Sequence, residues 1–448
     1  MKIAVIGGVA AGTSAAAKAR RTDPDAEIVI FEKGKEISYG GCGLPYYISD
    51  IIAERDKLIA FTDEEFEAKY GVEVRIEHEV REIDSHEKML YYTNLASGQD
   101  GAYQYDKLII ATGASPIKPP FEGFEKDNIF VLRSVEDGDL IKEAANREGT
   151  KKAVIIGAGL IGLEMAEAFT EMGLKTTVIE LQPQVLPPFS QEMAELVEEE
   201  LRKKGVDLVL NDGVAAFKGG EKLEKVVTES GKEIEADLAL LSIGVKANSQ
   251  LAKKAGIEIG ETGAIKINEK METNLKDIYA AGDCAESKDL ITAQAAWIPL
   301  GSTANKQGRT AGENAAGGSY KHRGILKTGI TKVFDLTAAR TGLSREEAEA
   351  NGFEVTEVKI KARNHAGYYP GVDIVNIKGV FANKDGRLLG AEVIGGEGSD
   401  KRIDVLVTAI QAGMTAADLF QLDLAYAPPY SSPKDPVAIL GMVAEKKL

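Results

Sequence analysis

The sequence contains very little cysteine, and this scarcity excludes a disulfide framework. Its 448 residues include two cysteines, Cys42 and Cys284, which lie more than two hundred residues apart. Proteins that depend on disulfides for stability carry many more, so this composition is typical of a reducing compartment. A cytoplasmic location is therefore expected.

Long apolar runs and an excess of positive charge are also missing. The longest apolar stretch, residues 153–169, is interrupted by glycines and by Glu164 and Glu167, and no secretory signal precedes the first strand-like segment. The net charge of −16 argues against a nucleic-acid-binding surface. Neither a membrane nor a nucleic acid is expected as a partner, and no metal site is expected. Small anionic ligands could still bind local basic clusters.

What the sequence does contain is the same strand–loop–helix–strand pattern twice. The first copy has a strand at 2–6, a glycine loop from Gly7 to Gly12, an alanine-rich helix and a second strand that ends at Glu32. Val9 stands where the middle glycine of a G-x-G-x-x-G fingerprint would be. The two remaining glycines still allow the tight turn and the close helix packing that the pattern requires.

The second copy meets the full fingerprint. A strand at 153–156 leads into Gly157-Ala158-Gly159-Leu160-Ile161-Gly162, and the strand after the helix ends at Glu180. One such fingerprint also fits a tight turn without a ligand, but two copies with a terminal acid indicate two dinucleotide sites. Glycines let the backbone approach a pyrophosphate at the helix N-terminus, and the acid accepts a ribose hydroxyl. Because a carboxylate at Glu180 would repel a 2′-phosphate, NADH is expected in preference to NADPH, which stays possible.

Two further buried strands bracket the second fingerprint and indicate how the domains are arranged. One ends at Ala111-Thr112-Gly113 and the other at Ala281-Gly282-Asp283. Together they suggest an α/β protein with two Rossmann-like domains, one inserted in the other, followed by an α+β domain. The predicted ranges are 1–115 and 247–320 for the first domain, 116–246 for the second and 321–448 for the third. In the third, strand-like runs lie at 331–334, 354–360, 372–377 and 389–394, before a helix at about 401–412.

Cys42 lies in a distinctive segment ten residues beyond Glu32, Ser38-Tyr39-Gly40-Gly41-Cys42-Gly43-Leu44-Pro45. No second cysteine is near, so a local dithiol cannot form, and a lone redox thiol beside a bound cofactor is expected. Unshielded N–H groups of the neighbouring glycines and a helix N-terminus are expected to lower its pKa. The competing interpretation is a small buried apolar residue, which is the expected role of Cys284.

These motifs resemble the flavin-dependent pyridine nucleotide–disulfide oxidoreductases over essentially the whole chain. Within that family, Ser38-Tyr39-x-x-Cys42 and the segment Tyr426-Ala427-Pro428-Pro429-Tyr430-Ser431-Ser432-Pro433-Lys434-Asp435 resemble the single-cysteine branch, the coenzyme A disulfide and CoA-persulfide reductases. The resemblance implies FAD at the first fingerprint, a nicotinamide cofactor at the second, and CoA disulfide or persulfide as substrate. It also implies a homodimer in which the C-terminal dimerisation domain completes the partner's active site.

The resemblance further implies a set of cofactor-binding positions. In chain order they are Gly7, Val9, Ala10, Gly12, Glu32, Lys33, Val80, Ala111, Thr112, Gly113, Gly157, Gly159, Ile161, Gly162, Glu180, Gly244, Gly282, Asp283, Pro299, Leu300 and Gly301. Among them, Asp283 would bind the ribityl chain of FAD and Gly244 would lie beside the nicotinamide.

The leaving thiolate needs a proton donor, for which two-cysteine relatives use a C-terminal histidine. None of the four histidines falls in residues 426–435. The resemblance assigns this role to two tyrosines of the partner subunit, Tyr368 and Tyr426, although Tyr369 adjoins the first. Packing at a subunit interface is the alternative interpretation of these side chains.

Coenzyme A brings an anionic ADP end, which requires local positive charge in this acidic protein. The resemblance implies contacts from Lys18, Arg21, Ser38 and Asn305. Cations near the end of a helix are also stabilised by its dipole, so a solvated helix terminus is an equal alternative for Lys18 and Arg21.

Two other functions fit parts of the pattern. NADH oxidases and NADH peroxidases of this family would cycle Cys42 through a sulfenate, but they carry a histidine in the first glycine loop where this chain has Ala10. Flavin-binding electron-transfer proteins share the two fingerprints but lack a reactive cysteine after the first.

Overall fold

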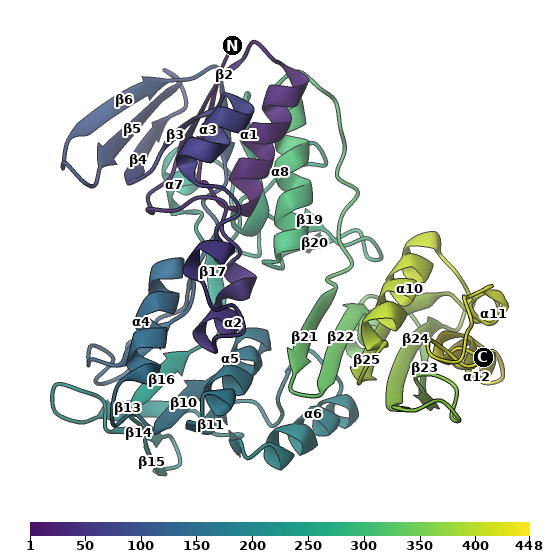
Figure 1. The fold of residues 1–448 in the computed structure, drawn as a ribbon. Coiled ribbons are helices and arrows are strands. Elements are labelled where there is room, and N and C mark those ends of the chain that lie inside the picture. Colours follow the sequence, from purple (N-terminus) through teal and green to yellow (C-terminus); the bar gives the residue numbers. More distant parts are fainter.

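The computed structural model describes all 448 residues and contains three packed units (Figure 1). The first is built on a five-stranded parallel sheet, because its strands are short apolar runs that are buried on both faces. In spatial order the strands are β18 (Ile278–Ala280), β7 (Lys107–Ile110), β1 (Lys2–Ile6), β2 (Glu27–Phe31) and β3 (Glu73–Arg75). β18 therefore joins this sheet from far along the chain, after the whole second fingerprint.

Two helices cover one face of the first sheet, α1 (Ala10–Thr22) and α8 (Gly301–Ala315). They cross very closely: a Cβ on Gly308 or Gly312 would lie 2.2 or 2.1 Å from a carbonyl oxygen of α1, so only glycine fits there. The other face is covered by an antiparallel sheet of β4 (His78–Asp84), β5 (Met89–Asn94) and β6 (Asp100–Gln104).

The second unit has a parallel sheet of the same kind. Its order is β12 (Asp207–Leu210), β11 (Lys175–Glu180), β10 (Lys152–Ile156), β16 (Leu238–Leu241) and β9 (Ile129–Val131). One face carries α4 (Val135–Asn146), α5 (Leu160–Glu171) and α6 (Gln191–Lys203), and the other a three-stranded sheet of β13 (Val214–Lys218), β14 (Lys225–Thr228) and β15 (Glu233–Glu235). The two covering antiparallel sheets were not predicted from the sequence.

Two antiparallel segments connect these units, β8 (Ala114–Pro116) and β17 (Val245–Ala247). Next to this strand pair, Thr112 and Asn248 exchange two hydrogen bonds. Thr112 Oγ1 donates to the Asn248 carbonyl at 2.7 Å, and Asn248 Nδ2 donates to the Thr112 carbonyl at 2.9 Å. The domain limits proposed at 115/116 and 246/247 lie in this strand pair, and they stay predictions.

The third unit is a five-stranded antiparallel sheet (Figure 1), with helices packed on both faces. Its order is β21 (Gly329–Val333), β22 (Leu336–Gly342), β25 (Leu388–Gly395), β24 (Ile374–Ala382) and β23 (Val355–Arg363), and its helices are α9 (Arg345–Ala350), α10 (Ser399–Ala412), α11 (Ala416–Gln421) and α12 (Pro436–Glu445). The predicted fold class, with an α+β C-terminal unit, is confirmed. The sequence did not reveal β22, whose small and polar residues lack a strand-like apolar alternation.

The remaining elements are short. They are α2 (Leu44–Ile48), α3 (Asp63–Tyr70), α7 (Gln250–Lys254), β19 (Ser287–Lys288), β20 (Ala295–Ala296) and three 3₁₀ turns at Gly41–Gly43, Arg55–Leu58 and Gly282–Cys284. No helix combines the length and the apolar character that a membrane span requires.

Candidate functional site

The two glycine loops have the same backbone geometry. Gly7 and Gly157 have φ angles of +103° and +101°, and a Cβ on either would lie within 2.6 Å of the carbonyl oxygen that ends a neighbouring strand. Gly12 and Gly162 each lie against the carbonyl of the first glycine, where a Cβ would be 1.8 or 2.0 Å away. Only glycine fits these four positions, so both loops are shaped for close backbone approach.

The helices that follow both loops begin without a capping side chain. Val9 and Gly159 are the N-caps of α1 and α5, and neither helix has an acid in its first turn. By contrast, α3, α4, α9 and α11 each start with a capping box. The space in front of the α5 N-terminus is open, because a Cβ on Gly159 would meet no atom within 4 Å. The side chain of Ile161, in the first turn of α5, is exposed. Each uncapped terminus leaves N–H donors for an anion such as a pyrophosphate.

The acids that end the second strand of each pattern, Glu32 and Glu180, accept hydrogen bonds from their own glycine loops. Glu32 Oε2 accepts the Gly8 N–H at 2.7 Å, and Glu180 Oε2 accepts the Ala158 N–H at 2.7 Å. The other carboxylate oxygen also accepts a backbone N–H. For Glu32 the donor is Gly34 at 2.7 Å, and for Glu180 it is Gln182 at 2.9 Å. The ribose interaction predicted from the sequence would use the remaining lone pairs, so each acid has a structural role that the sequence pattern did not reveal.

The strand ends predicted to line the first site meet near Asp283. Its carboxylate pairs with Arg133 at 3.1 Å, and its carbonyl accepts the indole N–H of Trp297, the single tryptophan, at 2.9 Å. Gly282 has a φ of +79°, and a Cβ there would lie 2.7 Å from the Ala11 side chain. The carboxylate predicted to bind the ribityl chain is therefore already paired with Arg133.

The other predicted cofactor positions lie on several different elements. Ala10 opens α1, Ala111 and Thr112 follow β7, Leu300 is the uncapped N-cap of α8, and Gly113 and Gly244 have positive φ angles. Val80 is buried in β4, Lys33 is exposed after Glu32, Pro299 is partly buried, and a Cβ on Gly301 would meet open space.

Cys42 lies in the 3₁₀ turn directly before α2 and its side chain is exposed. Its segment is tied to the first glycine loop, because the Ser38 N–H donates to the Gly8 carbonyl at 2.9 Å. Ser38 itself has a φ of +50°. Cys284, in contrast, is fully buried and its thiol donates to the carbonyls of Ile110 and Ala281 at 3.4 Å, which is a packing role.

The expected lowering of the Cys42 pKa is wrong for the protein alone. Crowding by surrounding protein atoms raises the pKa of the thiol, the carboxylates of Glu164 and Asp283 raise it further, and Arg133 opposes them. Two of the neighbouring glycine N–H groups are also not free, since the Gly40 N–H donates to the Leu58 carbonyl at 2.7 Å and the Gly43 N–H to the Gly40 carbonyl at 2.8 Å. In the protein alone, the surroundings of Cys42 therefore favour the thiol over the thiolate.

Glu164 is a functional candidate that sequence reasoning missed. It lies on α5, two residues after Gly162, and its Oε1 accepts the Thr331 hydroxyl at 3.1 Å. Burial raises its pKa to about 7, with a further contribution from Glu167. The available signal was an acid inside the apolar helix of a fingerprint, a place where charge is costly and often functional.

The C-terminal unit brings Tyr368 and Tyr426 together. Tyr368 lies between β23 and β24, Tyr426 lies between α11 and α12, and their hydroxyl oxygens are 3.4 Å apart. This hydrogen bond raises the pKa of Tyr426. Tyr369 instead packs edge-on against His365 at 5.5 Å, so the geometry favours Tyr368 as the paired residue.

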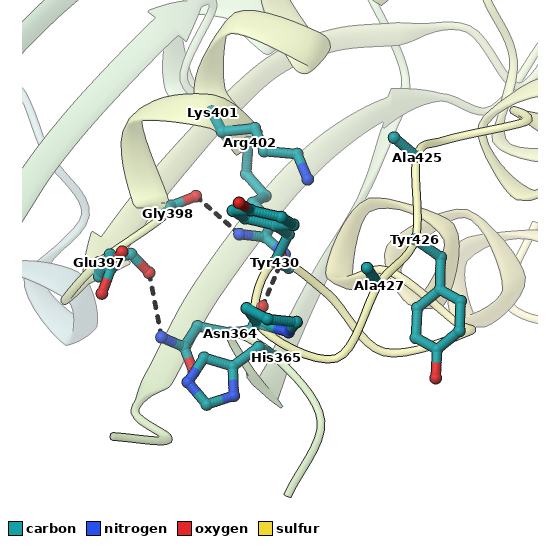
Figure 2. A pocket seen from close by; sticks show the side chains of 11 residues that line it. Asn364, His365, Glu397, Gly398, Lys401, Arg402, Ala425, Tyr426, Ala427 and Tyr430 are labelled. Atoms are coloured by element: carbon teal, nitrogen blue, oxygen red, sulfur yellow. Dashed lines mark hydrogen bonds between the residues drawn. The ribbon is translucent and has the colours of Figure 1, made fainter. Parts of the chain in front are cut away.

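This tyrosine pair is remote from Cys42 of the same chain. Figure 1 shows α11 and α12 at the outer end of the C-terminal unit, well separated from α2. Tyr368 and Tyr426 are 76% and 49% exposed. Figure 2 shows the ring of Tyr426 directed away from the buried side chains of Asn364, His365 and Arg402.

Three of the four predicted CoA contacts, Lys18, Arg21 and Asn305, lie along α1 and α8, and Ser38 lies in the segment before Cys42. Lys18 pairs with Glu313 at 3.1 Å, and Asn305 Nδ2 donates to the Ser14 hydroxyl at 2.8 Å. The Arg20 guanidinium is committed to backbone carbonyls, whereas Arg21 is exposed at the end of α1. Arg21 is thus the cation of this helix most available to an anionic ligand.

Comparison with known proteins identifies the class of protein that this fold and site define. The sequence model of the pyridine nucleotide-disulphide oxidoreductases matches residues 1–308, and that of their dimerisation domain matches residues 329–436. The chain belongs to this family.

Several individual members of the family are similar to this chain over its whole length. The chain is 40% identical to the NAD(P)H sulfur oxidoreductase (CoA-dependent) of Pyrococcus furiosus, over 99% of this chain and 98% of that one. It is 38% identical to an NADH oxidase of Methanocaldococcus jannaschii (100% and 99%) and 35% to the coenzyme A disulfide reductase of Staphylococcus haemolyticus (99% and 99%). The solved structure of a NAD-dependent persulfide reductase from A. fulgidus superposes with a TM-score of 0.97 at 43% identity, covering 100% of this chain and 83% of that one.

Proposed function

We propose that this protein is an NADH-dependent flavoenzyme that reduces CoA disulfide or CoA persulfide through Cys42, as a homodimer in the cytoplasm. The observation that carries the proposal is an exposed cysteine without a second cysteine, tied by Ser38 to the first glycine loop. A lone thiol in this position can exchange only with a sulfur that arrives on a substrate. The names of the relatives agree with that chemistry.

The chain's own residues fit the two cofactors. FAD would lie on the uncapped start of α1, with Glu32 on its ribose and Asp283 on its ribityl chain, and when bound it supplies two-electron transfer between nicotinamide and sulfur. The nicotinamide cofactor would lie on the uncapped start of α5 with Glu180 on its ribose. The carboxylate of Glu180 favours NADH over NADPH by repelling a 2′-phosphate.

The sulfur chemistry would proceed in two exchanges at Cys42. The Cys42 thiolate attacks one sulfur of CoA disulfide, forming a Cys42–CoA mixed disulfide and releasing one CoA thiolate, which takes a proton. Two electrons from NADH then break the mixed disulfide, so the second CoA leaves as a thiol after protonation and the Cys42 thiolate returns. With CoA persulfide the first exchange releases hydrogen sulfide in place of the first CoA.

The proton would come from the tyrosine pair of the partner subunit. A leaving thiolate needs a nearby acid, and no histidine lies in residues 426–435. Tyr368 and Tyr426 share a hydrogen bond, so either hydroxyl can donate while the other stabilises the oxygen left behind. The ADP end of CoA would be held by Arg21, with Lys18, Ser38 and Asn305 nearby.

Intact mass of the purified protein, kept under non-reducing conditions, tests the proposal most simply. A thiol-labile adduct of CoA mass on the peptide that contains Cys42 is expected. A Cys42 that is unmodified, or that carries only oxygen, even after incubation with CoA disulfide would contradict it.

A second candidate is an NADH oxidase that cycles Cys42 through a sulfenate, which the name of the M. jannaschii relative favours. Ala10 opposes it, because a methyl group at the start of α1 cannot assist proton transfer to oxygen. Turnover with O₂ or H₂O₂ that exceeds turnover with CoA disulfide would select this function.

A further inference from the structure

The guanidinium of Arg402 lies between the two loops that carry the tyrosine pair. Arg402 belongs to α10 and is 1% exposed. It is the largest side chain of the protein that is fully buried. A buried charge is costly unless its hydrogen-bonding groups are satisfied, so its partners indicate what it stabilises.

Its hydrogen bonds reach both tyrosine-bearing loops. Nη2 donates to the carbonyl of Asn364 at 2.7 Å, four residues before Tyr368, and to the carbonyl of Tyr430 at 3.2 Å, four residues after Tyr426. Figure 2 shows the bond to Asn364 and the bond from Nη1 to the Gly398 carbonyl, which measures 3.0 Å. One guanidinium therefore fixes the distance between the two loop backbones.

An acid and a hydroxyl complete this arrangement. Asp435 accepts Arg402 Nη2 at 2.9 Å and the Ser431 hydroxyl at 2.7 Å, and its other oxygen caps α12 through the Val437 N–H at 3.0 Å. The ion pair is almost completely buried, with 2% and 5% of the two side chains exposed. The end of the second loop is thereby attached to both α10 and α12.

The tyrosine side chains lack packing that could position them in the same way. A cavity of about 260 Å³ lies beside the loops and is lined by Arg402, Tyr426 and Tyr430. The only direct backbone bond between the loops is long, from the Ala366 N–H to the Pro428 carbonyl at 3.3 Å. The loops can thus shift into open space if the guanidinium no longer connects them.

We propose that Arg402 is a positioning residue that holds Tyr368 and Tyr426 within hydrogen-bonding distance of each other. The inference rests on the proposed function, in which this pair protonates the leaving thiolate. Arginine is required because Nη2, at the far end of the side chain, makes every contact to the loops and to Asp435, while Nη1 holds the Gly398 carbonyl. The lysine side chain is one bond shorter and has a single nitrogen, so it cannot keep all these contacts.

Arg402→Lys in the FAD-loaded dimer is the first test, with Arg387→Lys as the matched control. Arg387 is in the same unit and pairs with Asp385 at 2.7 Å, but it contacts neither tyrosine loop. Arg402→Lys is expected to lower kcat with CoA disulfide about tenfold through misplacement of the proton donor. KM for NADH, FAD content and NADH oxidation by ferricyanide are expected to stay unchanged. Unchanged kcat in Arg402→Lys would overturn the proposal.

Ser431→Ala covers the case in which Arg402→Lys does not fold. It removes one contact of Asp435 and is expected to lower the same kcat about threefold. Wild-type kcat in a folded Ser431→Ala dimer would then count against the proposal.

A spectroscopic readout separates this inference from the proposed function. In protein labelled with 3-fluorotyrosine, the ¹⁹F resonances of the pair can be assigned with Tyr368→Phe and Tyr426→Phe. Both resonances should move together in Arg402→Lys, or in Ser431→Ala, but not in Arg387→Lys, whether or not CoA disulfide is a substrate. If wild-type protein fails to reduce CoA disulfide while the resonances still move, the proposed function fails and the positioning role stands. Resonances that do not move would overturn the positioning role.

Discussion

The segment around Cys42 and the two loops around Tyr368 and Tyr426 are built in opposite ways. The cysteine segment is short, follows the first glycine loop, and is anchored by a backbone bond from Ser38. The tyrosine loops are long, lie at the edge of the C-terminal unit, and are tied together by one buried arginine. The first region has the thiol, and the second has the paired tyrosine hydroxyls but no redox group. In the proposed function neither region is a complete active site, and a second copy of the chain would join them.

The largest expected effect is the loss of the thiol itself. Cys42→Ser should reduce NADH-dependent turnover of CoA disulfide by about 10³-fold or more, because a hydroxyl cannot form the mixed disulfide. NADH oxidation by ferricyanide, which does not need the thiol, should persist. Steady-state assays of both reactions check this.

Cys284→Ala is the matched control for that prediction. Since Cys284 is buried and only packs, the variant should keep full turnover and lose stability by about 1 kcal/mol in urea unfolding. Cys42→Ser with undiminished disulfide reduction would instead indicate a flavin electron-transfer protein.

The next largest effect concerns the tyrosine pair. Tyr368→Phe and Tyr426→Phe should each lower kcat by about 10²-fold, the usual contribution of a general acid. The double variant should be little worse than either single one, because the two hydroxyls act as a unit. Tyr369→Phe is the control and should stay near wild type, since Tyr369 packs on His365. Equal losses from all three variants would show that interface packing is their role.

Glu180 allows a smaller, cofactor-specific test. Glu180→Gln removes the charge next to the ribose, so the ratio of kcat/KM for NADPH to that for NADH should rise about tenfold. Glu171→Gln, on the exposed side of the same unit, should leave the ratio unchanged. An unaltered ratio in Glu180→Gln would remove the basis for the predicted NADH preference.

The smallest expected effect is that of the Glu164 charge on the pKa of the Cys42 thiol. With its pKa at about 7, Glu164 is neutral in acid and negative above neutrality, where it disfavours the Cys42 thiolate. Glu164→Gln removes this charge, so the pKa of Cys42 should fall and iodoacetamide should alkylate reduced Cys42 about threefold faster at pH 8. The same rate below pH 6 in both proteins is expected, because Glu164 is then neutral. Faster alkylation in Glu171→Gln as well would contradict this account.

The parts of the fold that follow from local pattern could be predicted from the sequence. Both glycine loops, the acids that end their second strands, and the return of β18 to the first sheet depend on short motifs with strict backbone demands. The strand β22 could not be predicted, because Thr337 to Arg340 show no apolar alternation and owe their strand conformation to neighbours on both sides.

The features of the site that the sequence did not reveal all depend on distant residues meeting in space. Glu164 lies near Cys42 only because α5 packs beside α2, and its carboxylate adds to the burial that raises the pKa of the thiol, against expectation. Arg402 looks like an ordinary helix arginine until its partners at Asn364 and Asp435 are known. Such contacts have no local pattern, so they require the structure.

Mixed dimers test most directly whether Cys42 of one subunit works with the tyrosines of the other. Cys42→Ser homodimers and Tyr368→Phe/Tyr426→Phe homodimers should both be nearly inactive with CoA disulfide. After the two are dissociated and reassembled at equal concentration, random mixing should restore about a quarter of wild-type activity, because half of the dimers then hold one intact site of two. Activity that stays at the level of the parent variants, with mixed dimers verified by native mass spectrometry, would contradict the shared site.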